Sequence, residues 1–240
     1  MGRKSTFKNI DVFVLCGGRG TRLRSVISDK PKILADIGGK PFIEILLDNL
    51  ALHGFRRIIL GVGHLKEEII NYFQANPRKD LQIEFSSEEA PLGTGGAVKK
   101  AKPLIKSNHF LAMNGDCFSP VDFRRFYETH LARKTLLSMV LTKTPDVSDY
   151  GKVELDGSGK IINFNEKKIS QKSALINAGI YLMRKDIFDF LPKKNRFSLE
   201  YDFFPKIILN NRCYGFMVES EYIDIGTPEK YLEAAKLFLK

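Results

Sequence analysis

The chain has 240 residues, of which 43% are hydrophobic and 28% are charged, and its formal net charge is +10. These values are ordinary for one large globular domain. No apolar run is long enough to span a bilayer, and the first residues, MGRKSTFKN, contain no hydrophobic signal core. The cysteines, Cys16, Cys117 and Cys213, are too far apart to suggest a disulfide framework or a zinc site. We therefore expect a cytoplasmic, reduced protein with no membrane partner.

The positive charge comes from scattered pairs of basic residues, such as Arg56–Arg57, Lys99–Lys100 and Lys193–Lys194. No sustained basic helix and no RNA-binding aromatic run accompanies these pairs. We expect no nucleic-acid partner, and we interpret the excess charge as solvated surface that attracts small anionic substrates.

Strand-like and helix-like segments alternate in the first half of the chain. Apolar runs predict strands at residues 11–16, 57–63, 81–88 and 109–116, and helical periodicity predicts helices at residues 41–54, 64–74 and 94–104. In the first helix, Pro41 suits the first turn and Gly54 the C-terminal cap. The alternation predicts a doubly wound, mainly parallel (Rossmann-like) α/β sheet, in which ligands bind beyond the carboxyl ends of the strands.

The second half is rich in strands. Residues 135–144 and 175–184 predict strands, and residues 151–156 and 160–166 flank a turn and predict a hairpin. We expect a helix near Ser198 without a clear capping box, late strands at residues 213–219 and 221–226, and a terminal helix with Thr227 as N-cap and Pro228 as first residue. The single domain is thus divided into a nucleotide-binding core (1–134), a β-rich substrate-covering part with return strands (135–226) and a C-terminal helix (227–240).

A glycine-rich turn follows the first strand, in the segment LCGGRGTRLRSVISDKPK of residues 15–32. Leu23 stands where a dinucleotide fingerprint needs its third glycine, and the segment contains no P-loop. Gly17, Gly18 and Gly20 nevertheless allow backbone N–H groups to surround an anion, and a basic side chain follows at residue 22. The turn indicates a phosphate site, although for an isolated Gly-Gly-x-Gly a solvated connection would be the simpler interpretation.

This turn is the first of a series of motifs. After LCGGRGTRL, PK (31–32) and GKP (39–41) come PLGTGGA (91–97), NGD (114–116), YGKV (150–153), NEK (165–167), INAGIY (176–181) and YIDIGTPEKY (222–231). In this order they closely resemble the signature of the sugar-1-phosphate nucleotidyltransferases, over almost the whole chain after the first ten residues. The resemblance implies that an oxygen of a sugar 1-phosphate attacks the α-phosphorus of a nucleoside triphosphate and that pyrophosphate leaves.

The resemblance also implies roles for individual residues. It gives catalytic roles to Arg22, Lys32 and Asp116, and nucleotide-binding roles to Leu15, Gly17, Gly18, Gly20, Thr21, Glu88, Pro91, Gly93, Thr94 and Gly115. Lys30 competes with Lys32, but the spacing to GKP selects Lys32. Ile33 and Asp36 replace prolines that are frequent in the family, which leaves the rigidity of this loop open.

The implied cofactor is Mg²⁺, bound by the hard carboxylate oxygens of Asp116 and Asp224. Cys117 is interpreted as a packing residue, because a thiolate is too soft for Mg²⁺. The implied sugar-phosphate-binding residues are Gly151, Glu166, Lys167, Asn177 and Gly179, with Glu200 as a weaker hydroxyl contact and Lys168 facing solvent. The histidines, His53, His64, His109 and His130, form no close-spaced set, and we give them no catalytic role.

Glu88 decides our prediction of the base. A carboxylate accepts hydrogen bonds from the adjacent N1–H and N2–H₂ of guanine, whereas the carbonyls of uracil and thymine would meet it badly. GTP is therefore the expected nucleotide, although Glu89 or the backbone near Gly93 could decide the base instead.

Within the family, LCGG, PLGTGGA, the compact length and DFFP (202–205) favour members that use a manno-configured heptose 1-phosphate. Such members supply capsule, S-layer or lipopolysaccharide synthesis. Mannose 1-phosphate, or UTP, CTP or dTTP, are the alternatives, and a nucleotide-sugar-binding regulator without catalysis is the alternative from another class. The retention of both metal carboxylates together with the cations argues against a regulator. The oligomeric state stays open between a monomer and a homodimer.

Overall fold

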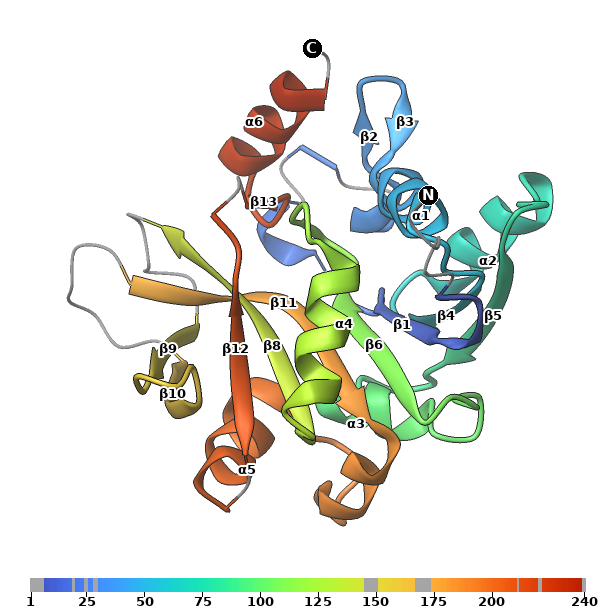
Figure 1. The fold of residues 1–240 in the computed structure, drawn as a ribbon. Coiled ribbons are helices and arrows are strands. Elements are labelled where there is room, and N and C mark those ends of the chain that lie inside the picture. The colour runs from blue at the N-terminus through green and yellow to red at the C-terminus, as the bar shows by residue number, and fades with distance from the viewer. Residues whose placement is uncertain are drawn as a thin grey trace, which may run out of the picture.

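A computed structural model describes residues 7–18, 20–23, 26–27, 30–144, 151–166, 174–210, 212–219 and 222–238, without the side chains of Thr144 and Glu166. In this part of the chain a nine-stranded sheet runs through the centre of the molecule, with helices on both of its faces (Figure 1).

The first half of the chain forms the parallel part of the sheet. Its strands are β1 (Asp11–Leu15), β4 (Arg57–Val62), β5 (Gln82–Ser87) and β6 (His109–Asn114). They lie in the order β5-β4-β1-β6, and each neighbouring pair is parallel. The chain moves from β1 outward to β4 and β5 and then returns to β6 on the other side of β1. This reversal confirms the predicted Rossmann-like fold class and opens a crevice at the carboxyl ends of β1 and β6.

The predicted helices of this half are α1 (Phe42–Leu52), α2 (Lys66–Ala75) and α3 (Gly93–Lys100). α1 begins directly after Pro41, and Gly54 follows its C-cap with a φ of +93°, a conformation that glycine adopts without strain.

The second half of the sheet is mixed. β11 (Ala174–Arg184) pairs antiparallel with β6 and with β8 (Leu137–Thr144). β9 (Gly151–Leu155) and β10 (Ile161–Glu166) form the predicted hairpin, and β12 (Cys213–Met217) lies parallel to β8. The register of β11 against β8 shifts between Asn177 and Tyr181. The sheet therefore changes from parallel to mostly antiparallel beyond β6.

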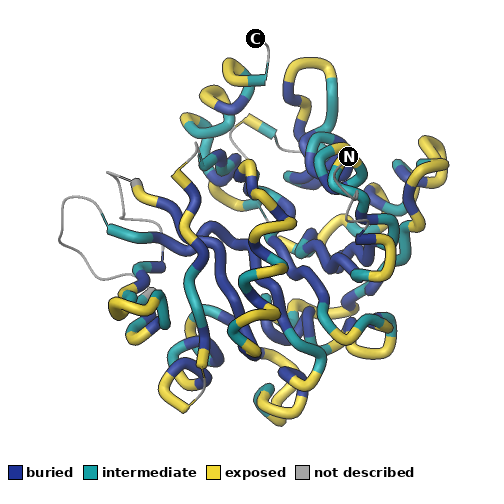
Figure 2. Tube along the Cα trace, viewed as in Figure 1, coloured by how far each residue is buried: buried dark blue, intermediate teal, exposed yellow. Residues whose placement is uncertain are grey.

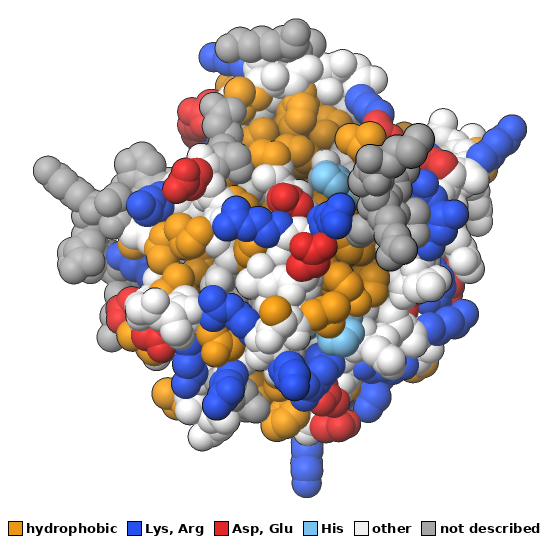
Figure 3. Space-filling view, in the orientation of Figure 1, with side chains coloured by type: hydrophobic (Ala, Val, Ile, Leu, Met, Phe, Trp, Pro, Cys, Tyr) orange, Lys and Arg blue, Asp and Glu red, His pale blue; other side chains and the backbone are white. Residues whose placement is uncertain are grey.

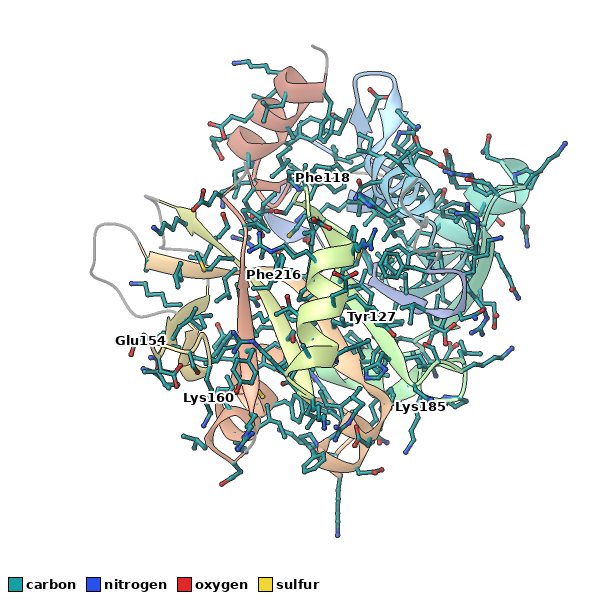
Figure 4. The ribbon with its side chains drawn as sticks, in the orientation of Figure 1. Phe118, Tyr127, Glu154, Lys160, Lys185 and Phe216 are labelled. Atoms are coloured by element: carbon teal, nitrogen blue, oxygen red, sulfur yellow. The ribbon has the colours of Figure 1, made fainter. Side chains whose placement is uncertain are left out.

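Two small pairings lie beside the main sheet. β2 (Asp36–Ile37) pairs with β3 (Lys40–Pro41), and β7 (Cys117–Phe118) pairs with β13 (Ile223–Asp224). The predicted terminal helix is α6 (Pro228–Phe238), whose Lys230 N–H donates to the hydroxyl of Thr227, 3.4 Å away. Phe118 lies beneath α6 (Figure 4) and makes an edge contact with Phe238, with 5.6 Å between the ring centroids. α6 therefore packs next to β7, which follows the carboxyl end of β6.

The patterns in the sequence gave no prediction for α4 (Phe123–Ala132), which crosses in front of the sheet (Figure 1). Asp122 caps this helix by accepting a hydrogen bond from Arg125 N–H, 3.0 Å away. Phe126 packs against Phe216 of β12, with 5.0 Å between the ring centroids (Figure 4). α4 covers the junction between the two halves of the sheet.

The helix expected near Ser198 begins with a π-helical turn, η5 (Leu199–Phe203), and continues as α5 (Phe204–Asn210). Ser198 is the N-cap of this helix, because its hydroxyl accepts hydrogen bonds from Glu200 N–H and Tyr201 N–H. Tyr201 stands where a capping box has Glu or Gln. The remaining short helices are 3₁₀ turns: η1 (Phe7–Asn9), η2 (Thr21–Leu23), η3 (Lys32–Leu34) and η4 (Lys185–Phe190).

The hydrophobic core lies on both faces of the sheet. Val12 and Val14 of β1 join one cluster with α1 and α4, whereas Phe13 joins the other with α3 and α5. The alternation follows from the two-residue period of a strand. Figure 2 shows the strands buried and the connecting loops exposed.

Lys and Arg side chains on the face seen in Figure 3 are interspersed with Asp and Glu and do not form one continuous stripe. Among the described residues, we find no helix with the length and apolar character required to cross a membrane.

Candidate active site

A cavity of about 540 Å³ opens at the carboxyl ends of β1, β5 and β6, beside the first turn of α3. Its lining residues are Leu15, Cys16, Gly17, Gly18, Lys32, Ile33, Glu88, Pro91, Gly93, Thr94, Ala97, Asn114, Asp116 and Arg196. Most of the residues expected to bind the nucleotide therefore meet in one place.

The glycine turn forms one wall of this cavity. Gly17 lies against the backbone of Gly63: a Cβ atom at residue 17 would be 3.5 Å from the Gly63 nitrogen. A Cβ atom at residue 18 would meet no protein atom within 4 Å. Gly20 has a φ of +57° and lies beside Lys32, although it does not line the cavity. The turn thus presents open backbone to the cavity at Gly18 and bends away at Gly20.

Other residues expected at the nucleotide lie outside the cavity lining. Thr21 and Arg22 are exposed on η2. Gly115 is a packing residue, since a Cβ atom there would lie 2.8 Å from the carbonyl oxygen of Leu15, to which Gly115 N–H donates over 2.9 Å. Gly115 thereby holds the ends of β1 and β6 together.

Lys32, and not Lys30, reaches the cavity. Lys30 is exposed, whereas the Lys32 side chain is 13% exposed and its Nζ lies 2.7 Å from Asp116 Oδ2. Burial would lower the pKa of Lys32, but the charge and hydrogen bond of Asp116 and the charge of Asp224 outweigh it, and the pKa is raised. Burial would likewise raise the pKa of Asp116, but the charge and hydrogen bond of Lys32 lower it. Both groups are therefore charged at neutral pH.

Of the two carboxylates expected to bind Mg²⁺, Asp224 lies on β13 and Asp116 lies in the turn directly before β7, the partner strand of β13. Asp224 of β13 is opposite Cys117 of β7, and Ile225 N–H donates to the carbonyl of Asp116 over 3.0 Å. Cys117 is buried, and its thiol donates to Asp116 Oδ1 over 3.2 Å. Burial, followed by the charges of the two carboxylates, raises the pKa of this thiol well above its ordinary value, so Cys117 is a neutral packing group.

Glu88 and Glu89 have different environments. Glu88 is 9% exposed, lines the cavity, and accepts a hydrogen bond at Oε2 from Leu92 N–H, 3.0 Å away. Burial raises the pKa of Glu88, and the Leu92 N–H and the charge of Lys100 partly oppose this. Glu89 projects into solvent, where its carboxylate pairs with Lys66 Nζ at 2.8 Å. Of these two carboxylates, only Glu88 is positioned to contact a ligand in the cavity.

The first turn of α3 is covered by residues 195–197. Gly95 N–H and Gly96 N–H donate to the Phe197 carbonyl over 3.0 and 3.2 Å, and Phe197 N–H donates to the Leu92 carbonyl over 2.9 Å. Gly93 has a φ of +75°, and a Cβ atom there would lie 2.6 Å from the Phe197 carbonyl oxygen. The glycines of PLGTGGA therefore allow this close approach, and two of their amides are unavailable to a ligand.

This contact brings Arg196 to the cavity. No motif in the sequence had pointed to this residue. Asn114 of NGD also lines the cavity, and its Oδ1 atom is buried without a hydrogen-bond partner among the described residues. Asn114 could have been identified as a site residue from its position in the NGD motif. No local signal was available for Arg196, because its position depends on the packing of a distant segment onto α3.

Of the residues expected at the sugar phosphate, Gly151 lies on β9, Glu166 on β10, and Asn177 and Gly179 on β11. Gly151 and Glu166 are paired across the β9–β10 hairpin, while Lys167 and the Glu166 side chain lie outside the described residues. Asn177 Nδ2 donates to the Tyr181 hydroxyl over 2.7 Å, and its Oδ1 accepts from Gly179 N–H over 2.9 Å. These bonds fix the irregular part of β11.

Gly179 connects this region to the cavity. It has a φ of +70°, and a Cβ atom there would lie 2.6 Å from Asn114 Nδ2. A side chain at residue 179 would therefore push β11 away from the cavity wall.

Glu200, expected as a hydroxyl contact, bonds within the protein. Its Oε2 accepts from the hydroxyls of Thr94 and Ser198, each over 2.6 Å. No histidine lines the cavity among the described residues.

The cavity thus has a buried carboxylate at one side and a Lys–Asp pair at another, at the switch point of a Rossmann-like sheet. Residues 12–240 match the nucleotidyl transferase family, and the chain belongs to this family.

Two relatives of similar length carry the name of a particular enzyme of this family. The chain is 37% identical over 227 residues to the D-glycero-α-D-manno-heptose 1-phosphate guanylyltransferase of Aneurinibacillus thermoaerophilus, covering 95% of this chain and 97% of that one. It is 35% identical to the enzyme of the same name from Campylobacter jejuni, with 92% and 97% covered. The structure of HddC from Yersinia pseudotuberculosis complexed with GMP-PN matches with a TM-score of 0.85 at 35% identity, covering 95% of this chain and 99% of that one.

Proposed function

We propose that this chain transfers GMP from GTP to D-glycero-α-D-manno-heptose 1-phosphate. A phosphate oxygen of the sugar phosphate forms a bond to the α-phosphorus, and the bond between that phosphorus and the bridging oxygen to the β-phosphate breaks. The products are GDP-heptose and pyrophosphate. The proposal is supported by the two full-length relatives with this activity in their names and, within the structure, by the buried Glu88 carboxylate in the cavity.

Glu88 supports guanine because of what a fixed carboxylate can accept. Leu92 N–H binds one of its oxygens over 3.0 Å and holds the group in the cavity wall. A guanine base offers two adjacent donors to such a group, whereas uracil and thymine would place carbonyl oxygens against it. Leaving a buried charge unpaired is costly, so the same contact that favours guanine disfavours the pyrimidines.

The phosphates would meet positive charge from two directions. Lys32 lies at the end of the glycine turn and Arg196 on the segment that covers α3, and both line the cavity. Stabilising the charge that develops on the phosphoryl oxygens is the main demand of phosphoryl transfer. The attacking phosphate oxygen is already ionised, so no general base is needed, in keeping with the absence of histidine from the described cavity lining.

Asp116 and Asp224 are proposed to bind Mg²⁺. Asp224 comes from β13 and Asp116 from the turn before its partner strand β7, and no cluster of three or more His, Cys, Asp or Glu residues suited to a metal is found in the described parts of the chain. Two oxygen ligands fit Mg²⁺, which usually takes one or two carboxylates and completes its shell with phosphate oxygens and water. When bound, the ion would neutralise the triphosphate and orient it for in-line attack.

The second candidate substrate is mannose 1-phosphate, which shares the manno configuration. The residues proposed to distinguish the two sugars are Gly151, Glu166, Lys167, Asn177 and Gly179. We also propose a cytoplasmic location, because the three cysteines are free, and a place in the synthesis of bacterial surface glycans such as capsule, S-layer or lipopolysaccharide.

The proposal is tested by incubating the purified protein with GTP, Mg²⁺ and the heptose 1-phosphate and following the reaction by phosphorus NMR. The expected result is a pair of diphosphate resonances from GDP-heptose together with free pyrophosphate. Unchanged GTP, with the protein shown to be folded, would contradict the proposal. GDP-mannose formed faster from mannose 1-phosphate would favour the second candidate.

A further inference from the structure

Each carboxylate proposed to bind Mg²⁺ is paired with a lysine. Lys32 Nζ lies 2.7 Å from Asp116 Oδ2, and Lys230 Nζ lies 3.3 Å from Asp224 Oδ2. Lys32 belongs to η3, after the glycine turn, and Lys230 to the first turn of α6. The two lysines therefore reach one pair of strands from distant parts of the chain.

The other oxygens of the two carboxylates are also engaged. Asp116 Oδ1 accepts from the Cys117 thiol over 3.2 Å, and Asp224 Oδ1 accepts from Gly226 N–H over 2.5 Å. Every oxygen of the two groups thus has a partner within the protein. A metal ion that binds these carboxylates would therefore have to share them with these partners or displace them.

The charges of this cluster cancel. Two carboxylates face two ammonium groups, at 2.7 Å for Lys32 and Asp116 and at 3.3 Å for Lys230 and Asp224. A divalent cation added alone would bring two further positive charges next to two lysines, and Mg²⁺ gives up its water reluctantly. A triphosphate brings enough negative charge to receive both Lys32 and the cation.

We propose that Lys32 and Lys230 take the place of the divalent cation in the nucleotide-free enzyme, and that the enzyme binds the cation only together with the triphosphate. Lys32 then moves from Asp116 to the phosphates, which frees Asp116 as a ligand. A lysine can make this exchange because it is a point charge on a flexible stem. Lys230 likewise occupies Asp224 Oδ2 until the exchange and then releases it. This inference rests on the proposed function.

The experiment measures Mn²⁺ binding to the nucleotide-free protein by electron paramagnetic resonance of the free ion. Wild-type protein is compared with Lys230→Met and Lys32→Met, and with Lys236→Met, an exposed lysine of the same helix, as the matched control. We expect wild type and Lys236→Met to bind Mn²⁺ weakly, and each of the other variants to bind it at least about tenfold more tightly, or about 1.4 kcal/mol.

A double variant, Lys230→Met with Asp224→Asn, should lose the gain in Mn²⁺ affinity, because the Asp224 carboxylate that Lys230→Met frees is no longer present. Lys230→Gln, which keeps a polar side chain of similar length, provides a second variant if Lys230→Met does not fold, as judged by thermal unfolding. Equal Mn²⁺ affinity in wild type and in folded variants at both lysines would overturn the inference. Since neither nucleotide nor sugar is present, this outcome is independent of whether the chain turns over GTP.

Discussion

Thr94 Oγ1 donates a hydrogen bond to Glu200 Oε2 over 2.6 Å, although 106 residues separate them in the chain. Thr94 Oγ1 also accepts from Leu199 N–H over 2.8 Å. The first turn of α3 and the first turn of η5 are thereby joined beside the cavity. The same junction carries Arg196, so the wall that would contact the nucleotide and the segment that supplies a cation form one unit.

This junction predicts that Thr94→Val weakens both the fold and substrate binding. The variant removes one of the two hydroxyls that donate to Glu200 Oε2 and leaves Leu199 N–H without its hydroxyl partner, so we expect a loss of about 1–3 kcal/mol in the free energy of unfolding. We also expect a higher KM with a smaller change in kcat. Thr94→Ser, which keeps the hydroxyl, should restore most of both. Urea denaturation and initial-rate kinetics check this, and a Thr94→Val enzyme equal to wild type would contradict it.

Lys32 and Lys30 provide a matched pair of substitutions. Lys32→Ala removes a buried cation from the cavity, and we expect kcat/KM to fall by about 10²–10³-fold, as when other preorganised charge stabilisers are removed. Lys30 is exposed, and Lys30→Ala should change the free energy of the transition state by less than about 0.5 kcal/mol. Pyrophosphate-release kinetics give both numbers. A larger loss of kcat/KM in Lys30→Ala than in Lys32→Ala would show that Lys32 is not the catalytic cation.

Alanine substitutions at Gly115 and Gly18 are expected to affect different properties, the first the stability of the fold and the second the binding of GTP. Gly115→Ala would place Cβ 2.8 Å from the Leu15 carbonyl oxygen, and we expect a loss of about 1–3 kcal/mol in stability. At Gly18, Cβ would meet no protein atom within 4 Å and would enter the cavity. Gly18→Ala should therefore keep its stability but raise the KM for GTP about tenfold, or 1.4 kcal/mol.

Thermal unfolding and GTP titration separate the two effects. Gly18→Ala with an unchanged KM would remove its backbone from the nucleotide site, and a fully stable Gly115→Ala would contradict the packing role of Gly115.

The patterns in the sequence predicted the strands and helices of the nucleotide half because their apolar periodicity is local. β1 and α1 each bury a regular set of apolar positions, and glycine or proline stands near the ends of α1. α4 was missed even though Asp122 gives a capping signal. Lys32, within the PK motif, and Glu88, just ahead of PLGTGGA, could be named in advance. Arg196 could not, since only the packing of Phe197 on the glycines of α3 brings it to the cavity.

The buried His130 predicts a loss of stability in acid. Burial, and then the charges of His109 and Arg184, lower the pKa of His130 from 6.5 to about 3. Its Nδ1 lies 2.8 Å from Ser138 Oγ. Between these two pKa values the unfolded chain binds a proton that the folded protein does not, so stability falls as the pH drops from 6.5 toward 3.

The contribution of this one group is at most about 1.4 kcal/mol per pH unit. His130→Asn removes it, and we expect a shallower pH dependence of the free energy of unfolding over this range, whatever its effect on stability at neutral pH. His64→Asn, at an exposed histidine, is the control. An unchanged slope in His130→Asn would show that this histidine does not titrate on unfolding.

The central claim is that this chain is a guanylyltransferase whose base choice depends on Glu88. The most direct test is pyrophosphate release with GTP, ATP, UTP, CTP and dTTP, each with D-glycero-α-D-manno-heptose 1-phosphate, for wild type and Glu88→Gln. We expect GTP to have the highest kcat/KM. We also expect Glu88→Gln to lose about 1.5–3 kcal/mol of this preference, the usual strength of a hydrogen bond to a charged group. No turnover with GTP, or a preference for GTP that Glu88→Gln leaves unchanged, would contradict it.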